Sequence, residues 1–397
     1  MADASTIPLG EFKLIGFTGR PIKSATRQRW AWWKGVDVIF GLERECFLGA
    51  QNWGKEADRV FSRHWNCVGR VETLFSDDNL AFYRTVQIGE FDVLLMRQSS
   101  GAIQAFHNVC RHRGTQLVSS ESGPLKNSCV TCPYHAWTYN EDGDLIGAPN
   151  MKDVDSFDPK QFGLKPVACV DWSGFVMVNP ACSDADFSAD FAPIIERMEA
   201  WDLGHLELKK TLQYEVKANW KLVFQNYSEC YHCPTVHPNL NRLTPYRGAS
   251  NDLEEGAILG GPMQLSEGTA TISSDGKRIG NLLPGLNHDQ QRLVYYYTLF
   301  PTMFVSAHPD YVMTHVIAPV DPSKTRISCH FLSESATRDE DMERATRQWD
   351  EVNRQDWEVC ELTQVGIQSP AYTPGPYSNL ETMLIAFDRH YRNVMNP

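Results

Sequence analysis

C-R-H-R-G at residues 110–114 and C-P-Y-H at residues 132–135 are two short segments that each offer one cysteine and one histidine. The four ligands expected from them are Cys110, His112, Cys132 and His135. Two thiolates and two imidazoles suit an iron–sulfur cluster in which cysteines hold one iron and histidines the other. A structural zinc site is the alternative, but zinc sites usually pair like ligands at close spacing. Because each segment here offers one cysteine and one histidine, the pattern favours the iron–sulfur cluster over the zinc site.

A second metal-ligand pattern, E-C-Y-H-C-P-T-V-H, occupies residues 229–237. His232 and His237 supply two imidazoles, and Pro234 and Pro238 prevent one continuous helix from running through both. Two imidazoles with one carboxylate hold a single ferrous iron and leave coordination positions open. An electron-transfer centre and an oxygen-activating iron in one chain predict an oxygenase.

The carboxylate of this second site has two main sources, Glu229 and Asp356. Asp356 falls in a helix expected over residues 339–368, on a mostly apolar stripe. The other members of the stripe are Trp349, Val352, Val359, Cys360 and Thr363. A carboxylate on a buried stripe is costly unless it is paired or metal-bound, which favours Asp356 as the ligand. The alternative is an aspartate that bonds a buried backbone group or arginine, and Asp350 and Glu361 are weaker candidates.

The expected secondary structure changes along the chain. Residues 41–64 are expected to be helical, with Asn52-Trp53-Gly54 interrupting, and short strands separated by turns follow from about Val68 to Val178. This pattern predicts a small all-β domain that carries the first ligand set on two loops. The predicted domains are 1–64, 65–180 and 181–397.

The second half of the chain reads as α+β, with a helix that opens at Asn219. Strands are expected at 294–304, 311–319 and 327–332. Residues 248–290 are weakly periodic and rich in small and acidic residues, so they predict a long excursion that acts as a mobile lid.

The composition, 42% hydrophobic and 22% charged, is ordinary for a soluble globular protein. A net charge of −12 argues against nucleic acid as a main partner. No apolar run is long enough for a membrane helix, so no membrane partner is expected. The N-terminus has no secretory pattern, and a cytoplasmic location is therefore expected.

Eleven cysteines raise the question of pairing. Outside Cys110 and Cys132 they are expected to be reduced. The two C-x-x-C pairs, 129–132 and 230–233, could mean a redox dithiol or half a zinc site. Each overlaps a better-formed ligand set, so these interpretations are weaker.

Five segments resemble those of the terminal oxygenase (alpha) subunits of Rieske non-haem iron oxygenases. They are C-R-H-R-G (110–114), C-P-Y-H-A-W-T-Y (132–139), N-W-K (219–221), N-Y-S-E-C-Y-H-C-P-T-V-H-P (226–238) and Q-D-W-E-V-C-E-L-T-Q-V-G (355–366). The resemblance covers nearly the whole chain after about residue 40. It implies an α+β fold in which an all-β Rieske [2Fe–2S] domain precedes a helix-grip (START/Bet v1-like) catalytic domain with an antiparallel sheet. It also implies that segment 1–64 packs on the catalytic domain.

The resemblance also implies roles for two carboxylates. Asp356 aligns with the third iron ligand, beside His232 and His237. Glu229 aligns with the acid that bridges the Rieske histidine of one subunit to an iron-ligating histidine of the next. Glutamate rather than aspartate at this position resembles the branch that oxidises quaternary ammonium compounds such as choline, glycine betaine, carnitine and stachydrine.

The activity implied is O2-dependent hydroxylation and N-demethylation of a small N-methylated cation. The chain has no nucleotide-binding glycine motif, so a separate flavin and iron–sulfur reductase is expected to deliver NAD(P)H electrons. Electron transfer between neighbouring subunits implies a homotrimer. The main alternative is the alpha subunit of an aromatic-ring dioxygenase with a small companion subunit. A Rieske electron carrier without catalysis is a further alternative, against which the second triad counts.

Cationic substrates are commonly held by aromatic faces. The pocket residues predicted on strands near the iron are Tyr295, Tyr297, Phe304 and His308. Ordinary strand packing is the alternative, because alternation points only half of such residues to one face. His308 and His315 are interpreted as structural or pocket-polar groups, and Arg247 or Arg292 is a candidate for holding a substrate carboxylate.

Overall fold

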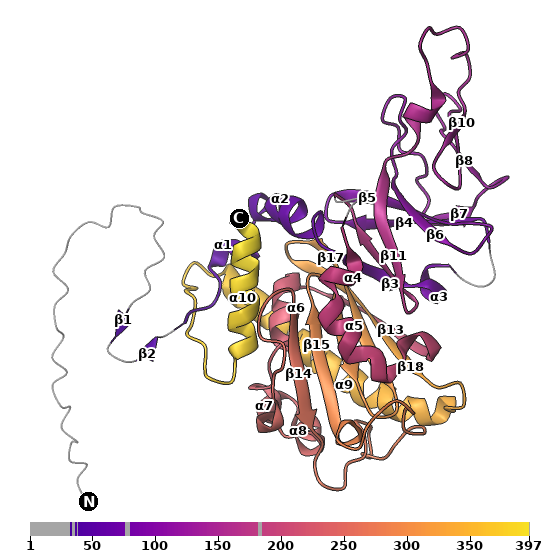
Figure 1. Cartoon of the computed structure of the whole chain (residues 1–397). Helices are drawn as coiled ribbons and strands as arrows, with labels where there is room; N and C mark the ends of the chain where they lie inside the picture. Colours follow the sequence, from indigo (N-terminus) through magenta and orange to yellow (C-terminus); the bar gives the residue numbers. More distant parts are fainter. Residues whose placement is uncertain (1–31, 34–35, 38, 76–79, 182–184, 397) are drawn as a thin grey trace, which may run out of the picture. The chain divides into compact units, whose positions relative to one another are not determined.

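The computed structural model describes residues 32–33, 36–37, 39–75, 80–181 and 185–396 (Figure 1). The chain divides into two units, Met1–Val38 and Ile39–Pro397. In the first unit, β1 (Trp32–Trp33) pairs antiparallel with β2 (Val36–Asp37). Most of the predicted N-terminal segment before residue 39 lies outside the described residues, as do the first residues on which the cytoplasmic prediction rests.

Residues 44–61 form three short helical elements. These are α1 (Arg44–Phe47), α2 (Ala50–Glu56) and a π-helical turn (Ala57–Phe61). The predicted interruption at Asn52-Trp53-Gly54 is wrong, because these residues lie inside α2. The break falls at Gly49, whose φ of 95° favours glycine. Asn52 fits the helix because its amide donates to the Cys46 carbonyl at 2.9 Å and to Tyr391 at 3.0 Å.

The first half of the larger unit is a β domain. Seven antiparallel strands run in the spatial order β3-β12-β11-β6-β5-β4-β7, and a smaller sheet has the order β10-β9-β8. The strands are β3 (Asn66–Arg70), β4 (Phe82–Ile88), β5 (Phe91–Arg97), β6 (Ile103–His107), β7 (Ser122–Pro124), β8 (Cys129–Thr131), β9 (Thr138–Asn140), β10 (Leu145–Gly147), β11 (Pro166–Trp172) and β12 (Phe175–Asn179). The predicted all-β domain is confirmed.

The second half is built on a six-stranded antiparallel sheet in the order β13-β18-β17-β16-β15-β14. The strands are β13 (Glu207–Val216), β14 (Ile258–Gln264), β15 (Leu293–Leu299), β16 (Met303–Ala307), β17 (Val312–Asp321) and β18 (Lys324–Ser333). A long helix, α9 (Asp339–Gln368), packs against the sheet, and its bounds match the predicted helix. This arrangement confirms the predicted helix-grip fold.

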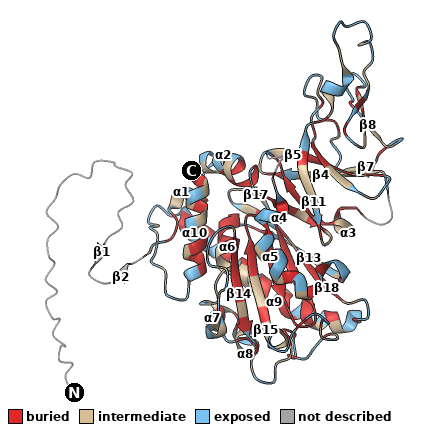
Figure 2. Cartoon of the chain, viewed as in Figure 1, coloured by how far each residue is buried: buried red, intermediate tan, exposed pale blue. Residues whose placement is uncertain are grey.

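Each face of the six-stranded sheet has its own core (Figure 2). One face packs on α5 (Ala192–Met198) and Trp201. The other packs on α9 and on α6 (Trp220–Tyr227), with α10 (Thr382–Met395) beyond α6. Because side chains alternate along a strand, neighbouring residues of β15 enter different cores.

A buried ion pair anchors the start of α6. Lys221, fully buried, lies 2.5 Å from the Glu56 carboxylate, which also accepts hydrogen bonds from Trp220 and Tyr391. Burial lowers the pKa of Lys221, and the Glu56 charge opposes that effect. Breaking such a pair by removing one partner leaves an uncompensated buried charge, so these residues fix the helix that leads into the second motif.

Two predictions about strands need correction. β14 lies inside the predicted excursion 248–290, and residues 294–304 form two strands, β15 and β16, rather than one. Gly260 and Gly261 made β14 look like a loop. They are required because a side chain at Gly260 would meet the Tyr296 carbonyl, and one at Gly261 the Ser250 carbonyl.

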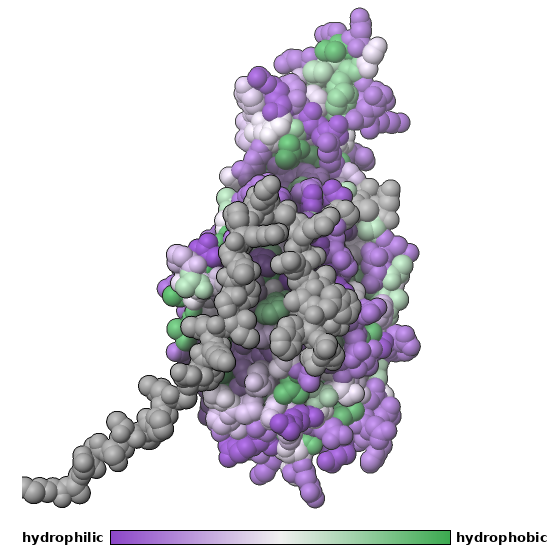
Figure 3. Space-filling model, turned by 90° about the vertical axis from the view of Figure 1, so that its left-hand side faces the viewer, coloured by the Kyte–Doolittle hydropathy of each residue, from purple (hydrophilic) through white to green (hydrophobic). Residues whose placement is uncertain are grey.

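The surface drawn in Figure 3 is mostly hydrophilic where residues are described, with small separate hydrophobic patches. Within the described ranges, no helix combines the length and apolar character needed to cross a membrane.

Candidate metal centres

The first ligand set gathers on two loops of the β domain. Cys110 and Cys132 are buried at 2% and 3% exposure, whereas His112 and His135 are exposed. The two histidine rings lie 4.7 Å apart between centroids, and His112 stacks on Trp137 at 4.8 Å. Two inner sulfurs and two outer imidazoles fit a mixed-ligand [2Fe–2S] cluster whose histidine side faces outward.

His112 carries a direct test of this assignment. We expect His112→Cys to shift the cluster spectrum toward that of an all-thiolate ferredoxin and to lower the reduction potential by roughly 200 mV or more. Redox titration followed by visible absorption and electron paramagnetic resonance measures both changes. His107→Cys, on β6 outside the motif, is the control and should leave both unchanged. An unaltered potential in His112→Cys would mean that His112 is not a ligand.

The second ligand set comes from three segments of the α+β domain. His232 ends the turn after α6, His237 lies between α7 (Cys233–Val236) and α8 (Pro238–Leu243), and Asp356 projects from α9. The Nε2 atoms of His232 and His237 lie 3.3 Å and 2.7 Å from the Asp356 Oδ1 atom. One ligand atom from each residue lies within 4.8 Å of the other two.

The outward nitrogens of both histidines are also held. His232 Nδ1 lies 2.6 Å from a Glu229 carboxylate oxygen, and His237 Nδ1 lies 2.7 Å from the Gln355 side-chain oxygen. These contacts fix each ring so that its Nε2 points inward, which is how partners around a metal site orient histidine ligands. Gln355 was missed from the sequence, where only its position next to Asp356 could have drawn attention.

Charge favours a cation at this centre. Burial alone would lower the pKa of His232, but the hydrogen bonds that the ring donates to Asp356 and Glu229 raise it to about 10. Burial raises the pKa of Asp356, yet bonds to His232 and His237 outweigh it and leave the pKa lowered. Two carboxylates therefore lie against the His232 ring, an arrangement whose negative charge a divalent metal can balance. The residues fit a ferrous ion.

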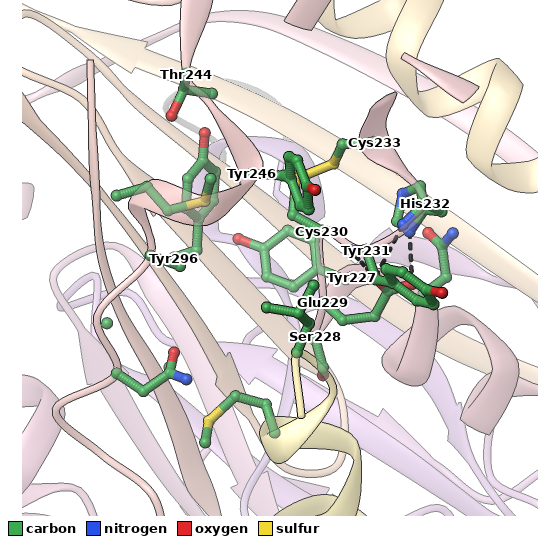
Figure 4. A pocket seen from close by; sticks show the side chains of 18 of the residues that line it. Tyr227, Ser228, Glu229, Cys230, Tyr231, His232, Cys233, Thr244, Tyr246 and Tyr296 are labelled. Atoms are coloured by element: carbon green, nitrogen blue, oxygen red, sulfur yellow. Dashed lines mark hydrogen bonds and ion pairs between the residues drawn. A yellow bond between two sulfur atoms is a disulfide. The ribbon is translucent and has the colours of Figure 1, made fainter. Parts of the chain in front are cut away.

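A cavity of about 420 Å³ opens on this centre. Its wall contains His232, His237 and Asp356, together with residues of β14, β15, α9 and the start of α10. The aromatic members of the wall are Tyr227, Tyr231, Tyr246, Tyr296 and Trp349. Figure 4 shows several of these rings around the turn that carries Glu229 and His232. The volume suits a small molecule.

The predicted pocket residues lie elsewhere. Tyr295 and Tyr297 belong to the opposite face of β15, where Tyr295 packs on Trp201 and Tyr297 donates to Asp252. The prediction is wrong for both, because strand alternation turns Tyr296 rather than its neighbours toward the cavity. Phe304 and His308 share the Tyr296 face but are fully buried behind the wall.

His308 and His315 are core histidines in this fold. His308 stacks on Tyr311 at 4.0 Å, and burial holds its pKa well below the usual value, so the ring is neutral. His315 Nε2 lies 3.2 Å from the Asn353 side-chain oxygen. Neither belongs to the metal cluster, which agrees with their interpretation as structural or pocket-polar groups.

Four other charged candidates occupy different positions relative to the cavity and the two histidines. Arg247 reaches the cavity wall and contacts the Tyr246 ring, whereas Arg292 is not part of that wall. Asp350 accepts a hydrogen bond from Tyr214, and Glu361 accepts one from the Lys217 backbone. Both carboxylates are therefore engaged away from the two histidines.

Cys230 and Cys233 form a disulfide (Figure 4). The expectation that the cysteines outside the first ligand set are reduced is wrong for this pair. The C-x-x-C spacing signalled the possibility, and the turn before α7 brings the two sulfurs together because the Cys233 backbone donates to the Cys230 carbonyl at 3.1 Å.

Two protein-family profiles match the chain. A Rieske [2Fe-2S] domain matches residues 64–158, and the catalytic domain of the ring hydroxylating alpha subunit matches residues 203–396. The two matches contain the first and second ligand sets respectively. The finer boundaries predicted above, at 64/65 and 180/181, stay predictions.

Curated relatives match over most of their length. The glycine betaine monooxygenase oxygenase subunit of Chromohalobacter salexigens is 30% identical over 376 residues, which cover 86% of this chain and 82% of the relative. The protein of the same name from Pseudomonas aeruginosa strain UCBPP-PA14 is 29% identical over 398 residues, covering 91% and 90%.

Solved structures show the same fold. A crystal structure of the quaternary ammonium Rieske monooxygenase CntA with an inhibitor superposes with a TM-score of 0.72. The match covers 91% of this chain and 96% of that one at 22% identity. At this identity the likeness establishes the architecture alone.

Proposed function

Because the chain belongs to the Rieske non-haem iron oxygenases, as a terminal oxygenase (alpha) subunit with a [2Fe–2S] cluster and a mononuclear iron, we propose that it hydroxylates and N-demethylates a small N-methylated cation. The named relatives, which are glycine betaine monooxygenase subunits, support this class of substrate. The observation that carries the proposal is the aromatic and acidic wall of the cavity beside His232, His237 and Asp356.

The cavity wall is built for a positive charge. Tyr296 meets Trp349 at 6.3 Å and Tyr227 at 6.2 Å between ring centroids, with steep interplanar angles of 68° and 74°. Rings set at such angles present faces and edges on adjoining sides of a space, and aromatic faces attract ammonium groups. Apart from Asp356, which we assign to the iron, the carboxylates of Glu229 and Glu254 outnumber the Arg247 guanidinium among the charged side chains of the wall.

The residues then have distinct tasks. We assign Cys110, His112, Cys132 and His135 to the cluster, and His232, His237 and Asp356 to the iron. When bound, the iron activates O2 with electrons from the cluster. The aromatic wall holds the N-methyl group toward the histidines and excludes water. An N-hydroxymethyl product breaks down to formaldehyde and the demethylated amine.

Electron supply requires partners. The proposal includes a separate flavin and iron–sulfur reductase that draws on NAD(P)H, and the oxygenase-subunit names of the relatives support a separate reductase. In Figure 1 the part of the β domain around β8 and β10 extends away from α7 and α8. Transfer between neighbouring chains of a homotrimer, through Glu229, suits that placement. A cytoplasmic location, where NAD(P)H is present, stays a prediction.

Substrate-dependent O2 uptake tests the proposal. With a matched reductase and NADH, a panel of N-methylated cations is compared with a panel of aromatic acids and arenes, and formaldehyde is assayed alongside. Stoichiometric formaldehyde from a betaine-like compound is the expected result. Uptake coupled only to an arene, without formaldehyde, would place the chain with the aromatic-ring dioxygenases instead.

Tyr296 gives a sharper test of the cation site. We expect Tyr296→Leu to raise KM for the cationic substrate by about 5- to 30-fold, the equivalent of about 1–2 kcal/mol, with a smaller change in kcat. Tyr296→Phe keeps the ring and should retain most of the affinity. Tyr295→Leu removes the same ring from the opposite face and is the matched control. Equal KM values for Tyr296→Leu and Tyr295→Leu would exclude Tyr296 from the cation site.

A further inference from the structure

The disulfide between Cys230 and Cys233 lies inside the second metal motif. It encloses Tyr231 and His232, and Glu229 directly precedes it. In Figure 4 the sulfur–sulfur bond stands beside the turn that carries His232. A covalent link at this point acts on the one histidine whose two ring nitrogens face Glu229 on one side and Asp356 on the other.

The enclosed turn is organised from both ends. One Glu229 oxygen accepts from the backbone amides of Tyr231 and His232, while the other bonds the His232 ring at 2.6 Å. On the far side, Cys233 is the first residue of α7, and its carbonyl accepts from the His237 amide at 2.8 Å. The disulfide thus ties the segment that carries Glu229 to the helix that leads to His237.

Small reagents can reach this bond. Cys230 and Cys233 both belong to the cavity wall, although Cys233 is only 3% exposed. Cys230 is half-buried, and Tyr231 between them is 55% exposed. The remaining described cysteines are unpaired. Among the cysteines that the structure describes, Cys230 and Cys233 are therefore the pair available for thiol–disulfide chemistry at the cavity.

We propose that Cys230 and Cys233 are a reversible dithiol–disulfide site that controls iron binding at the second centre. The disulfide holds His232 in position between Glu229 and Asp356. Reduction opens the turn, lets the His232 ring leave that position and weakens iron binding. The inference rests on the proposed iron site, because its readout is the affinity of that site. Loss of partners that orient a metal ligand typically lowers metal affinity 10- to 100-fold.

Reduction and oxidation of the disulfide each balance in electrons and protons with simple reagents. A dithiol reductant transfers two electrons and two protons to the disulfide, which leaves two thiols in this chain and a disulfide in the reductant. In the reverse direction, hydrogen peroxide takes two electrons and two protons from the thiols and gives the disulfide and two waters. Two-electron reduction of O2 that is not coupled to substrate oxidation forms that peroxide at the same cavity.

The redox state of the pair can be read directly. Trypsin cleaves after Lys221 and Arg242, so the peptide 222–242 contains both cysteines and no other. The full-length protein is denatured without reductant in the presence of iodoacetamide, which alkylates free thiols. It is then digested with trypsin, and the peptide masses are measured by mass spectrometry. After peroxide we expect an unalkylated peptide, and after dithiothreitol a doubly alkylated one. Full alkylation even after peroxide would overturn the proposal.

Ferrous iron affinity supplies the second readout. Oxidised protein, reduced protein freed of dithiothreitol, and the double variant Cys230→Ser/Cys233→Ser are titrated anaerobically against a coloured chelator. We expect the reduced protein and the variant to bind iron about 10- to 100-fold more weakly than the oxidised protein. Cys169→Ser, which replaces a partly buried cysteine on β11, is the control. In its oxidised form it should bind iron as tightly as the oxidised wild-type protein, and it should lose affinity on reduction as the wild-type protein does. Equal affinities in both redox states would overturn the proposal.

The same titration distinguishes failure of the redox switch from failure of the iron-site assignment. If the oxidised wild-type protein binds iron and Asp356→Ala does not, the iron site is established without reference to the cysteines. If the centre binds iron equally well with and without the disulfide, only the switch fails. Reduced wild-type protein covers the case in which the double serine variant does not fold.

Discussion

Asp356→Ala is expected to abolish mononuclear iron binding and turnover while the red-brown Rieske cluster remains. Among the residues that the structure describes, Asp356 is the one carboxylate within reach of both His232 Nε2 and His237 Nε2. Removing it leaves two imidazoles, and a ferrous site needs the third ligand to hold the ion with useful affinity. We expect iron to fall from about three to about two per chain, and turnover to fall by at least about 1,000-fold, which corresponds to about 4 kcal/mol.

The measurement for Asp356 combines iron analysis with the visible spectrum of the same sample. Glu358→Ala, an exposed carboxylate on α9, is the matched control and should keep all of its iron. Thermal unfolding of both variants checks that the helix remains folded. Retention of mononuclear iron and activity by Asp356→Ala would make the ligand assignment wrong.

Glu229→Gln is expected to leave both metals bound and to slow electron transfer between them by about 10- to 100-fold. Glutamine keeps the size of the side chain and can still accept from His232 Nδ1, but it loses the negative charge that accompanies the raised His232 pKa. In the proposed trimer the same carboxylate contacts a Rieske histidine of the neighbouring chain. The loss therefore falls on transfer rather than on assembly of either centre.

Stopped-flow oxidation of the reduced cluster by O2 measures the Glu229 effect in a single turnover. Glu254→Gln also removes a cavity carboxylate, but the His232 ring nitrogens are held by Glu229 and Asp356 instead, so it is the matched control. An unchanged rate of cluster oxidation in Glu229→Gln would remove Glu229 from the electron path.

Much of the architecture was predictable because its signals are local. The β domain follows from short strands between turns, and α9 was predicted with its observed bounds from its apolar stripe. The stripe was less regular than expected, since Trp349, Val352 and Cys360 are buried whereas Thr363 is exposed. Ligand spacing brought Cys110 and Cys132, and His232 and His237, to attention because tight turns hold such pairs together.

The features that were missed depend on distant contacts. Whether Tyr295 or Tyr296 faces the cavity depends on the register of β15, and a one-residue shift exchanges the two faces. β14 exists because Gly260 and Gly261 admit close backbone neighbours, which a glycine pair in a sequence does not reveal. Gln355 orients the His237 ring only because α9 places its side-chain oxygen against His237 Nδ1.

The most direct test of the central claim is a single-turnover reaction without any reductase. The protein is reduced chemically so that cluster and iron each hold one available electron, freed of reductant, mixed with an N-methylated cation and exposed to O2. We expect cluster oxidation together with formaldehyde and demethylated product, up to one of each per chain, and neither product from Asp356→Ala. Cluster oxidation without formaldehyde from every N-methylated cation, together with a hydroxylated product from an arene, would contradict the account.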